Sequence, residues 1–242
     1  HVKSFGHNNL EYLELALKHS QDAYKTKLVI VDGVYSQGGD LARLPEINTL
    51  CKKYDAMLMV DDAHGMGVFG ENGRGTAEHY GCLGQIDIIT GTFSKSFGCV
   101  GGFVAASHEL VEYLRYYADS NIFSAAITPQ VTASVLKALE LIKKQPEIRK
   151  KLRSRLLEEG FDIGDSVSPI FPIMIRDTQK AYDAAQMLRE KGVLAISIVY
   201  PAVRLREARL RVSVLASHER EDLDLLITSL LETDKKLGIR HG

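Results

Sequence analysis

The sequence predicts an α/β fold in which a mostly parallel β-sheet has helices on both faces and a small C-terminal α+β domain follows. Two observations carry this prediction. Short apolar runs rich in β-branched residues alternate with segments of helical period, which is typical of a parallel sheet covered by helices. Beyond the charged stretch 143–147, the order changes to strand, helix, two strands and helix. We therefore predict a large domain over residues 1–145 and a small domain over residues 146–242.

The predicted elements follow from these patterns. The strands of the large domain are expected at residues 27–31, 57–60, 87–90 and 101–105, and helices at 44–54, 109–117 and 130–143. The helix at 44–54 has Pro45 and Glu46 in its first turn, where a missing N–H and a negative charge are both favourable. The small domain is expected as a βαββα group with strands at 170–175, 193–199 and 210–215 and helices at 179–191 and 219–237.

The composition is that of an ordinary globular protein and excludes several classes. Hydrophobic residues make up 45% of the 242 residues, and charged residues 25%. The formal net charge of −1 gives no electrostatic reason for nucleic-acid binding. Three scattered cysteines argue against a disulfide framework, and no apolar run reaches the ~18 residues of a membrane-spanning helix. We expect a cytoplasmic enzyme without a metal, a nucleic-acid partner or a transmembrane segment.

Two acids and a histidine follow the second predicted strand. Residues 60–65 read Val-Asp-Asp-Ala-His-Gly, and glycine-rich chain comes next. In an open α/β sheet, ligands bind beyond the carboxyl ends of the strands, so a site is expected here. A buried acid needs a cation, which a protonated pyridine nitrogen or a metal ion would supply. A strand end with solvated acids is the alternative interpretation.

A single lysine stands among hydroxyl groups after the third predicted strand. Residues 91–98 read Gly-Thr-Phe-Ser-Lys-Ser-Phe-Gly, so Lys95 has a serine on each side. Hydroxyls and backbone amides suit a phosphate group, and a lysine with a lowered pKa can attack a carbonyl. The segment is not a nucleotide-binding phosphate loop, because that motif requires glycine where Ser94 stands. Taken alone, a mobile loop with a solvated lysine is an equally good interpretation.

A third polar segment follows the first predicted strand. Residues 32–40 read Asp-Gly-Val-Tyr-Ser-Gln-Gly-Gly-Asp, which alone indicates only a turn of small residues. Together, however, the three segments place polar, glycine-punctuated chain at the same edge of one sheet. Chance explains this coincidence poorly, so we expect one joint site at that edge.

These segments resemble the motifs of the α-oxoamine synthases, a family of fold-type I enzymes that use pyridoxal 5′-phosphate (PLP). Residues 61–65, 92–95 and 34–40 carry the resemblance, which extends to residues 6–10, 200–203 and 209–211. The resemblance implies the PLP-dependent transferase fold of aspartate aminotransferase type, a homodimer with a shared active site, and the joining of an amino acid to an acyl-CoA with loss of CO2.

The resemblance also implies a role for each matching residue at the cofactor. Lys95 holds PLP as a Schiff base and later moves the α-proton. Asp61 pairs with the pyridinium nitrogen, which keeps the ring an electron sink. His64 hydrogen-bonds the 3′-oxygen of the ring, as does Ser36 or its neighbourhood, and the methyl group of Ala63 packs on one ring face.

The remaining implied roles concern the phosphate and the substrate. Thr92 and Ser94 hold the phosphate, which oriented donors favour. Ser124 belongs to a segment that reaches the phosphate of the partner subunit. Arg211 binds the substrate carboxylate with a bidentate fork, and Ala202 stands in the substrate segment.

Chains of this family carry a longer N-terminal region that supplies a histidine stacked on PLP and much of the acyl-CoA surface. We therefore expect that the N-terminal part of the family fold is absent and that this sequence is a truncated or incompletely ordered enzyme. Residues 147–161 also read as shorter than the corresponding helix of the family.

Within the family, residues 92–96 and 6–9 look most like the soluble bacterial serine palmitoyltransferases. That likeness implies L-serine and palmitoyl-CoA as substrates, 3-oxosphinganine as product and a place in sphingolipid biosynthesis. The alternatives within the family are 8-amino-7-oxononanoate synthase, glycine C-acetyltransferase and 5-aminolevulinate synthase. From other classes, a non-catalytic partner subunit is disfavoured by the presence of Lys95, and a metal- or nucleotide-binding module would use Asp61, Asp62 and His64.

Overall fold

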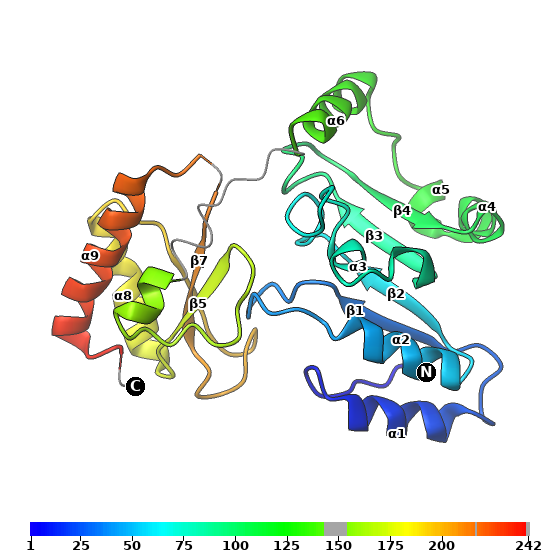
Figure 1. Ribbon diagram of the computed structural model, residues 1–242, viewed down its shortest axis with the longest axis horizontal. Helices are drawn as coiled ribbons and strands as arrows, with labels where there is room; N and C mark the ends of the chain where they lie inside the picture. The colour runs from blue at the N-terminus through cyan, green and yellow to red at the C-terminus, as the bar shows by residue number, and fades with distance from the viewer. Residues whose placement is uncertain (143–153, 216, 241–242) are drawn as a thin grey trace. The chain divides into compact units, whose positions relative to one another are not determined.

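The computed structural model describes residues 1–142, 154–215 and 217–240 (Figure 1). The chain divides into two compact units. The first unit consists of His1–Val34 and Leu41–Lys144, and the second of Tyr35–Asp40 and Gln145–Gly242. The short segment Tyr35–Asp40 was not expected in the second unit. The assignment of residues 1–145 and 146–242 to two separate domains stays a prediction.

The first unit is built on a four-stranded sheet. Its elements are α1 (Leu10–Ser20), β1 (Leu28–Asp32), α2 (Leu44–Lys53), β2 (Met57–Asp61), α3 (Thr76–His79), η1 (Leu83–Gln85), β3 (Ile88–Thr92), β4 (Gly102–Ala106), α4 (His108–Tyr117), α5 (Asp119–Ile122) and α6 (Pro129–Ile142). The strand order is β1-β2-β3-β4, with β1, β2 and β3 parallel and β4 antiparallel to β3. The four strands predicted from the sequence are confirmed, with small displacements of their ends.

The alternation of side chains gives this sheet two different faces. Val31 and Val60 are register partners, and both are buried on the face where α2 packs against β2. The side chains of the alternate strand residues point to the other face, where Ile30 is 56% exposed. Asp32 and Asp61 end β1 and β2 on this second face, because they lie one residue beyond the buried pair. The sheet therefore presents both carboxylates on its less covered face.

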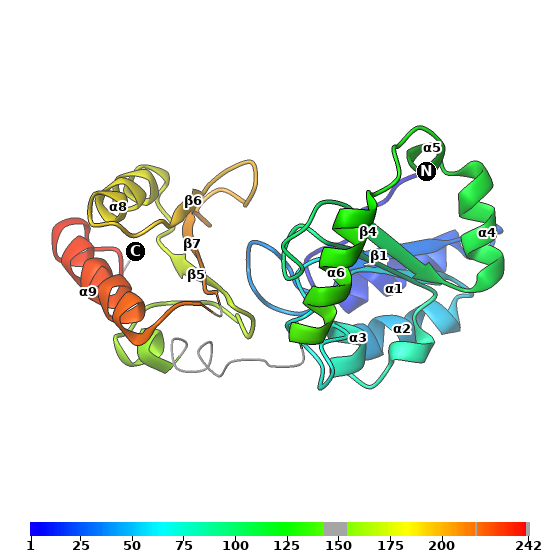
Figure 2. The same ribbon diagram turned by 90° about the horizontal axis from the view of Figure 1, so that it is seen from above.

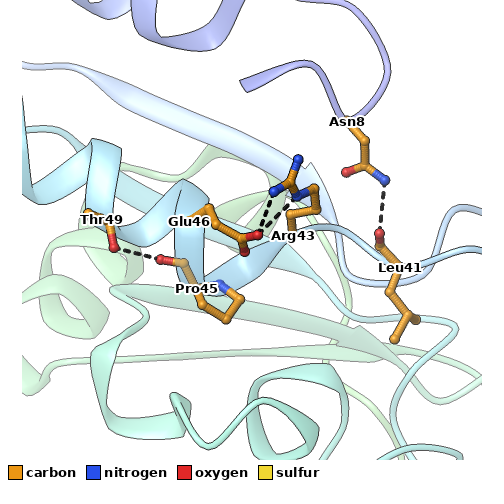
Figure 3. Close-up of polar contacts among 6 residues, drawn as sticks. All are labelled: Asn8, Leu41, Arg43, Pro45, Glu46 and Thr49. Carbon is orange, nitrogen blue, oxygen red and sulfur yellow. Dashed lines mark hydrogen bonds and ion pairs between the residues drawn. The ribbon is translucent and has the colours of Figure 1, made fainter. Parts of the chain in front are cut away.

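Local side-chain contacts fix the chain around the start of α2 (Figure 3). Arg43 donates to Glu46 at 2.7 Å across the first turn, and Pro45 stands in that turn as predicted. The side-chain amide of Asn8 donates to the carbonyl oxygen of Leu41 at 2.9 Å. This bond ties the segment before α1 to the chain between β1 and α2.

The second unit is a three-stranded antiparallel sheet with two long helices. Its elements are β5 (Ile170–Met174), α8 (Thr178–Glu190), β6 (Ile196–Ile198), β7 (Arg209–Ser213) and α9 (Arg220–Leu237), and the strand order is β5-β7-β6. The predicted βαββα group is thus confirmed. Helices α8 and α9 lie beside each other on one side of the sheet in both views (Figures 1 and 2).

One strand of this unit is shorter than predicted. The expected strand 193–199 is reduced to Ile196–Ile198 because both of its ends are used in turns. The amide of Val193 donates to Leu188 at the end of α8, and the carbonyl of Val199 accepts from Ala202. The core of the unit remains continuous, with Phe161 and Leu210 almost fully buried. Residues 147–153 of the segment 147–161, which was expected to be shorter than the family's helix, lie outside the described residues, and that expectation stays a prediction.

Candidate active site

Polar residues of neighbouring strands meet at one end of the four-stranded sheet. Asp32 of β1 is the register partner of Asp61 of β2, and Asp61 is in turn the partner of Thr90 of β3. Because β1, β2 and β3 are parallel, their carboxyl ends share this edge. The predicted gathering of the segments after β2 and β3 at one edge is therefore confirmed. Of the predicted segment after β1, only the residues up to Val34 belong to the first unit. Tyr35–Asp40 belong to the second unit.

The turn after β2 holds Asp61, Ala63 and His64. The amide of Ala63 donates to Oδ1 of Asp61 at 3.0 Å, so the turn itself orients this carboxylate. All three residues are half-buried. A partly accessible carboxylate fixed by one amide still has lone pairs to offer a cationic ligand.

The loop between β3 and β4 carries the lysine. Its ends are closed by hydrogen bonds between the main chains of Phe93 and Gly101 at 2.9 Å and of Cys99 and Phe93 at 2.6 Å. The hydroxyl of Ser96 donates to the carbonyl of Met66 at 2.7 Å. These bonds hold the backbone on both sides of the lysine.

Within that loop, hydroxyl groups cluster beside Lys95. Thr92 Oγ1 lies 2.7 Å from Ser94 Oγ, and the amide of Ser94 donates to Thr92 Oγ1 at 3.1 Å. Ser94 and Lys95 are exposed, while Phe97 anchors the loop from a buried position. The loop thus presents two hydroxyls and an ammonium group together.

The electrostatics link Lys95 to the carboxylates at the strand ends. Desolvation raises the pKa of Asp32, the negative charge of Asp61 raises it further, and the positive charge of Lys95 lowers it. The ammonium group is therefore near enough to act on Asp32. Asp32 was part of a predicted segment, but no role was predicted for it. Its position in the strand alternation, on the same face as Asp61, was the signal that could have identified it.

The second acid of the motif has a different environment from the first. Asp62 is fully buried, and both of its carboxyl oxygens accept hydrogen bonds from Thr76. Burial, its largest cause, raises the pKa of Asp62 to about 6, against the lowering effect of the bonds from Thr76. Sequence reasoning missed Thr76 altogether.

Among the described residues, no three His, Cys, Asp or Glu side chains form a group that could hold a metal ion. This finding gives no support to the metal-binding alternative that combined Asp61, Asp62 and His64. In the same described ranges, no helix is long and apolar enough to cross a membrane.

The remaining predicted site residue of the first unit is Ser124. It lies in the loop between α5 and α6 and is exposed, as are its neighbours. Its predicted role toward a partner subunit stays a prediction.

Three predicted site residues belong to the second unit and are described within it. Ser36 is half-buried in the segment Tyr35–Asp40. Ala202 is exposed in the turn that follows the cis peptide bond between Tyr200 and Pro201. Their predicted roles stay predictions.

Arg211 of β7 is the third, and it contrasts with Arg209 on the same strand. Arg209 donates to the carbonyl of Glu207 at 2.9 Å and pairs with its carboxylate at 3.2 Å. Arg211 is half-buried, burial lowers its pKa, and its Nε atom has no hydrogen-bond acceptor among the residues that the structure describes. A half-buried guanidinium without a carboxylate partner is suited to an anionic ligand.

Comparison with known proteins agrees with this geometry. The model of the family "Aminotransferase class I and II" matches residues 2–230. The chain therefore belongs to the aminotransferase class I and II family, and the predicted PLP-dependent transferase fold is confirmed.

The similar proteins place it more narrowly. An 8-amino-7-oxononanoate synthase from Petrotoga mobilis is 44% identical over 96% of this chain and 61% of its own length. A serine palmitoyltransferase from Sphingobacterium spiritivorum is 40% identical over 98% of this chain and 61% of its own. The solved Sphingomonas wittichii serine palmitoyltransferase is 32% identical, with a TM-score of 0.89 over 96% of this chain and 60% of that one. The predicted likeness to the α-oxoamine synthases is confirmed, and the chain spans about 61% of the length of these curated relatives.

Proposed function

We propose that this chain carries the cofactor-binding part of a PLP-dependent acyltransferase of the α-oxoamine synthase type. The observation that carries the proposal is the edge of the first unit's sheet, where Asp61 ends β2 and the loop after β3 presents Lys95 beside the hydroxyls of Thr92 and Ser94. A solved structure of serine palmitoyltransferase (SPT) with PLP is 34% identical to this chain and has a TM-score of 0.88. It supports the choice of cofactor.

The groups at this edge match the chemistry of PLP. A carboxylate suits a protonated ring nitrogen, a primary amine suits an aldehyde carbon, and hydroxyls with backbone amides suit a phosphate. Asp61, Lys95 and the pair formed by Thr92 and Ser94 supply these three kinds of group within one sheet edge. The donor set therefore fits the cofactor.

When bound, PLP supplies an electron sink that stabilises a carbanion at the α-carbon of an amino acid. Asp61 would keep the ring nitrogen protonated, and His64 would hydrogen-bond the 3′-oxygen, as would Ser36 or its neighbourhood. The methyl group of Ala63 would pack on the ring. Lys95 Nζ would hold the cofactor and move the proton at the α-carbon.

Other residues bind the phosphate and the amino acid. Thr92 and Ser94 would bind the phosphate, and Ser124 would reach the phosphate bound by a second copy in a homodimer with a shared active site. Arg211 binds the carboxylate of the amino acid, a role supported by its unpaired Nε, and Ala202 borders the substrate.

The reaction joins the α-carbon of the amino acid to the acyl carbon of the thioester. The thioester C–S bond breaks and releases CoA, and the bond from the α-carbon to the carboxylate breaks and releases CO2. We propose L-serine and palmitoyl-CoA as the first substrate pair, with a cytoplasmic, sphingolipid-forming role. The TM-scores of 0.87 to 0.90 to SPT structures support that pair.

A second candidate is 8-amino-7-oxononanoate synthesis from L-alanine and a pimeloyl thioester. It is supported by the 44% identity to the Petrotoga mobilis protein. The test is to load the chain with PLP and titrate L-serine, L-alanine and glycine separately, following the visible absorbance of the cofactor. A response to L-serine at the lowest concentration is expected; a lower half-saturation for L-alanine would reverse the order of the two candidates.

A further inference from the structure

Asp62 belongs to the predicted motif but has no role in the proposed function. It follows Asp61 directly and is 0% exposed, on the buried side of the strand alternation. Thr76, the first residue of α3, donates to it twice: its amide to Oδ2 at 2.7 Å and its hydroxyl to Oδ1 at 3.0 Å. Both carboxyl oxygens are therefore used inside the protein, and neither is available to a ligand.

The main chain of Asp62 closes the turn that carries the site residues. Its amide donates to the carbonyl of Thr90 on β3 at 2.9 Å, which continues the strand ladder by one residue. Its carbonyl accepts from the amides of Gly65 at 3.0 Å and Met66 at 2.9 Å. Ala63 and His64 lie between these bonded positions, so the placement of Asp62 determines theirs.

Glycines surround the carboxyl group on three sides. A Cβ atom built on Gly33, Gly65 or Gly75 would lie 2.3, 2.0 or 1.9 Å from a carboxyl oxygen of Asp62. Such distances are far below van der Waals contact, so the backbone itself packs against the carboxyl group. Gly33 follows β1 and Gly65 follows β2, and the single side chain of Asp62 thus contacts the chain after both strands.

We propose that Asp62 and Thr76 form a positioning pair that fixes the turn bearing Asp61 and His64 for the cofactor. The inference rests on the proposed function for the identity of that cofactor. Asp62 does not contact PLP in this account; it acts through Asp61, whose Oδ1 accepts from Ala63 within the same turn. Loosening the pair would move the acceptor for the ring nitrogen.

The experiment compares three variants of the full chain. Thr76→Val removes the hydroxyl donor at nearly constant volume, and Thr76→Ser keeps it. Thr233→Val makes the same change at a buried threonine of the second unit whose Oγ1 has no partner among the described residues. For each variant, the dissociation constant of PLP and the pH midpoint of its visible absorbance are measured.

We expect Thr76→Val to bind PLP about tenfold more weakly and to shift the pH midpoint, because a hydrogen bond to a buried carboxyl group is lost. Thr76→Ser should stay within about twofold of the parent chain, since its hydroxyl is kept. Thr233→Val should leave both values unchanged. Equal PLP binding and an unchanged pH midpoint in Thr76→Val, or the same loss in Thr233→Val, would overturn the inference.

Backbone hydrogen exchange in the chain without PLP provides a second readout that does not depend on the cofactor. The amides of Gly65 and Met66 should exchange about tenfold faster in Thr76→Val, and at the parent rate in Thr233→Val. Unchanged exchange would overturn the inference by itself. A parent chain that binds no PLP, while the exchange result holds, would instead count against the proposed function and leave the fixing of the turn supported.

Discussion

Asp32 and Asp61 are register partners on neighbouring parallel strands, so two carboxylates stand side by side at the carboxyl ends of β1 and β2. Burial and the charge of Asp61 both raise the pKa of Asp32, and the positive charge of Lys95, in the loop after β3, lowers it. The protonation of Asp32 therefore depends on a neighbouring negative charge and on a nearby positive one.

Removing the lysine should raise the pKa of Asp32. Desolvation and the charge of Asp61 already raise that pKa, and Lys95 opposes them. In Lys95→Ala the opposing charge is gone, so the carboxyl group of Asp32 should titrate at a higher pH. Side-chain carboxyl NMR across an acid titration measures this. Lys18→Ala, on α1, is the matched control, and an equal rise in both variants would contradict the placement of Lys95.

Asp62 should give the stability of the first unit a specific pH dependence. Its pKa is raised from 3.8 to about 6, with burial as the main cause, so the folded protein keeps this proton where the unfolded chain has lost it. The contribution of Asp62 to stability is therefore full below about pH 4 and is lost as the pH rises toward 6. Since each pKa unit corresponds to about 1.4 kcal/mol, the loss is about 3 kcal/mol.

The variant that tests this is Asp62→Asn, which has no proton to lose. We compare the free energy of unfolding of the variant with that of the parent chain. The difference, variant minus parent, should be lowest near pH 4 and should rise by about 3 kcal/mol by pH 7. Urea unfolding at a series of pH values measures the difference. Asp22→Asn, at an exposed position, should show no such trend. A difference between Asp62→Asn and the parent that does not vary with pH would rule out the raised pKa.

The hydroxyl pair should select for the phosphate of the cofactor. Thr92→Val and Ser94→Ala each remove one member of the pair, whose oxygens lie 2.7 Å apart. Each should lower the affinity for PLP about tenfold while changing the affinity for pyridoxal, which lacks the phosphate, much less. Competition binding with both compounds measures the ratio, and Ser4→Ala serves as an exposed control. An equal loss for both compounds would place the phosphate elsewhere.

Much of the fold could be predicted because its signals are local. The alternation of β-branched runs with helical segments located β1 to β4, and the change of order near residue 145 indicated the βαββα group. The same period-two rule also separates Asp61 from Asp62, since successive strand residues point to opposite faces. This alternation along β2 predicts that Asp62 lies on the buried face together with Val60.

Other parts of the site depend on long-range contacts that the sequence does not show. Thr76 meets Asp62 from fourteen residues away, and nothing in the local pattern around Thr76 marks it. The inclusion of residues 35–40 in the second unit depends on Gly39, which packs where a Cβ atom would lie 2.2 Å from the carbonyl oxygen of Ile170. Such contacts are decided by packing between distant segments, for which hydrophobic periodicity carries no information.

Arg211 should contribute to the affinity for the amino acid but not for PLP. Its half-buried guanidinium has no carboxylate partner in the described part of the chain, in contrast to Arg209. Truncating one member of a desolvated charge pair costs about 2–5 kcal/mol, so Arg211→Gln should weaken L-serine binding about 30-fold or more. Titration of the PLP-loaded chain measures this, with Arg189→Gln on α8 as control. Unchanged L-serine affinity in Arg211→Gln would remove Arg211 from the substrate site.

The role of Lys95 as the residue that holds the cofactor is tested most directly by trapping. The chain is incubated with PLP, reduced with borohydride and digested, and the peptides are analysed by mass spectrometry. We predict that the phosphopyridoxyl group is found on the peptide containing Lys95, and that Lys95→Ala retains no label and no visible absorbance from bound cofactor. Labelling spread over other lysines, or the same absorbance in Lys95→Ala as in the parent chain, would contradict the account.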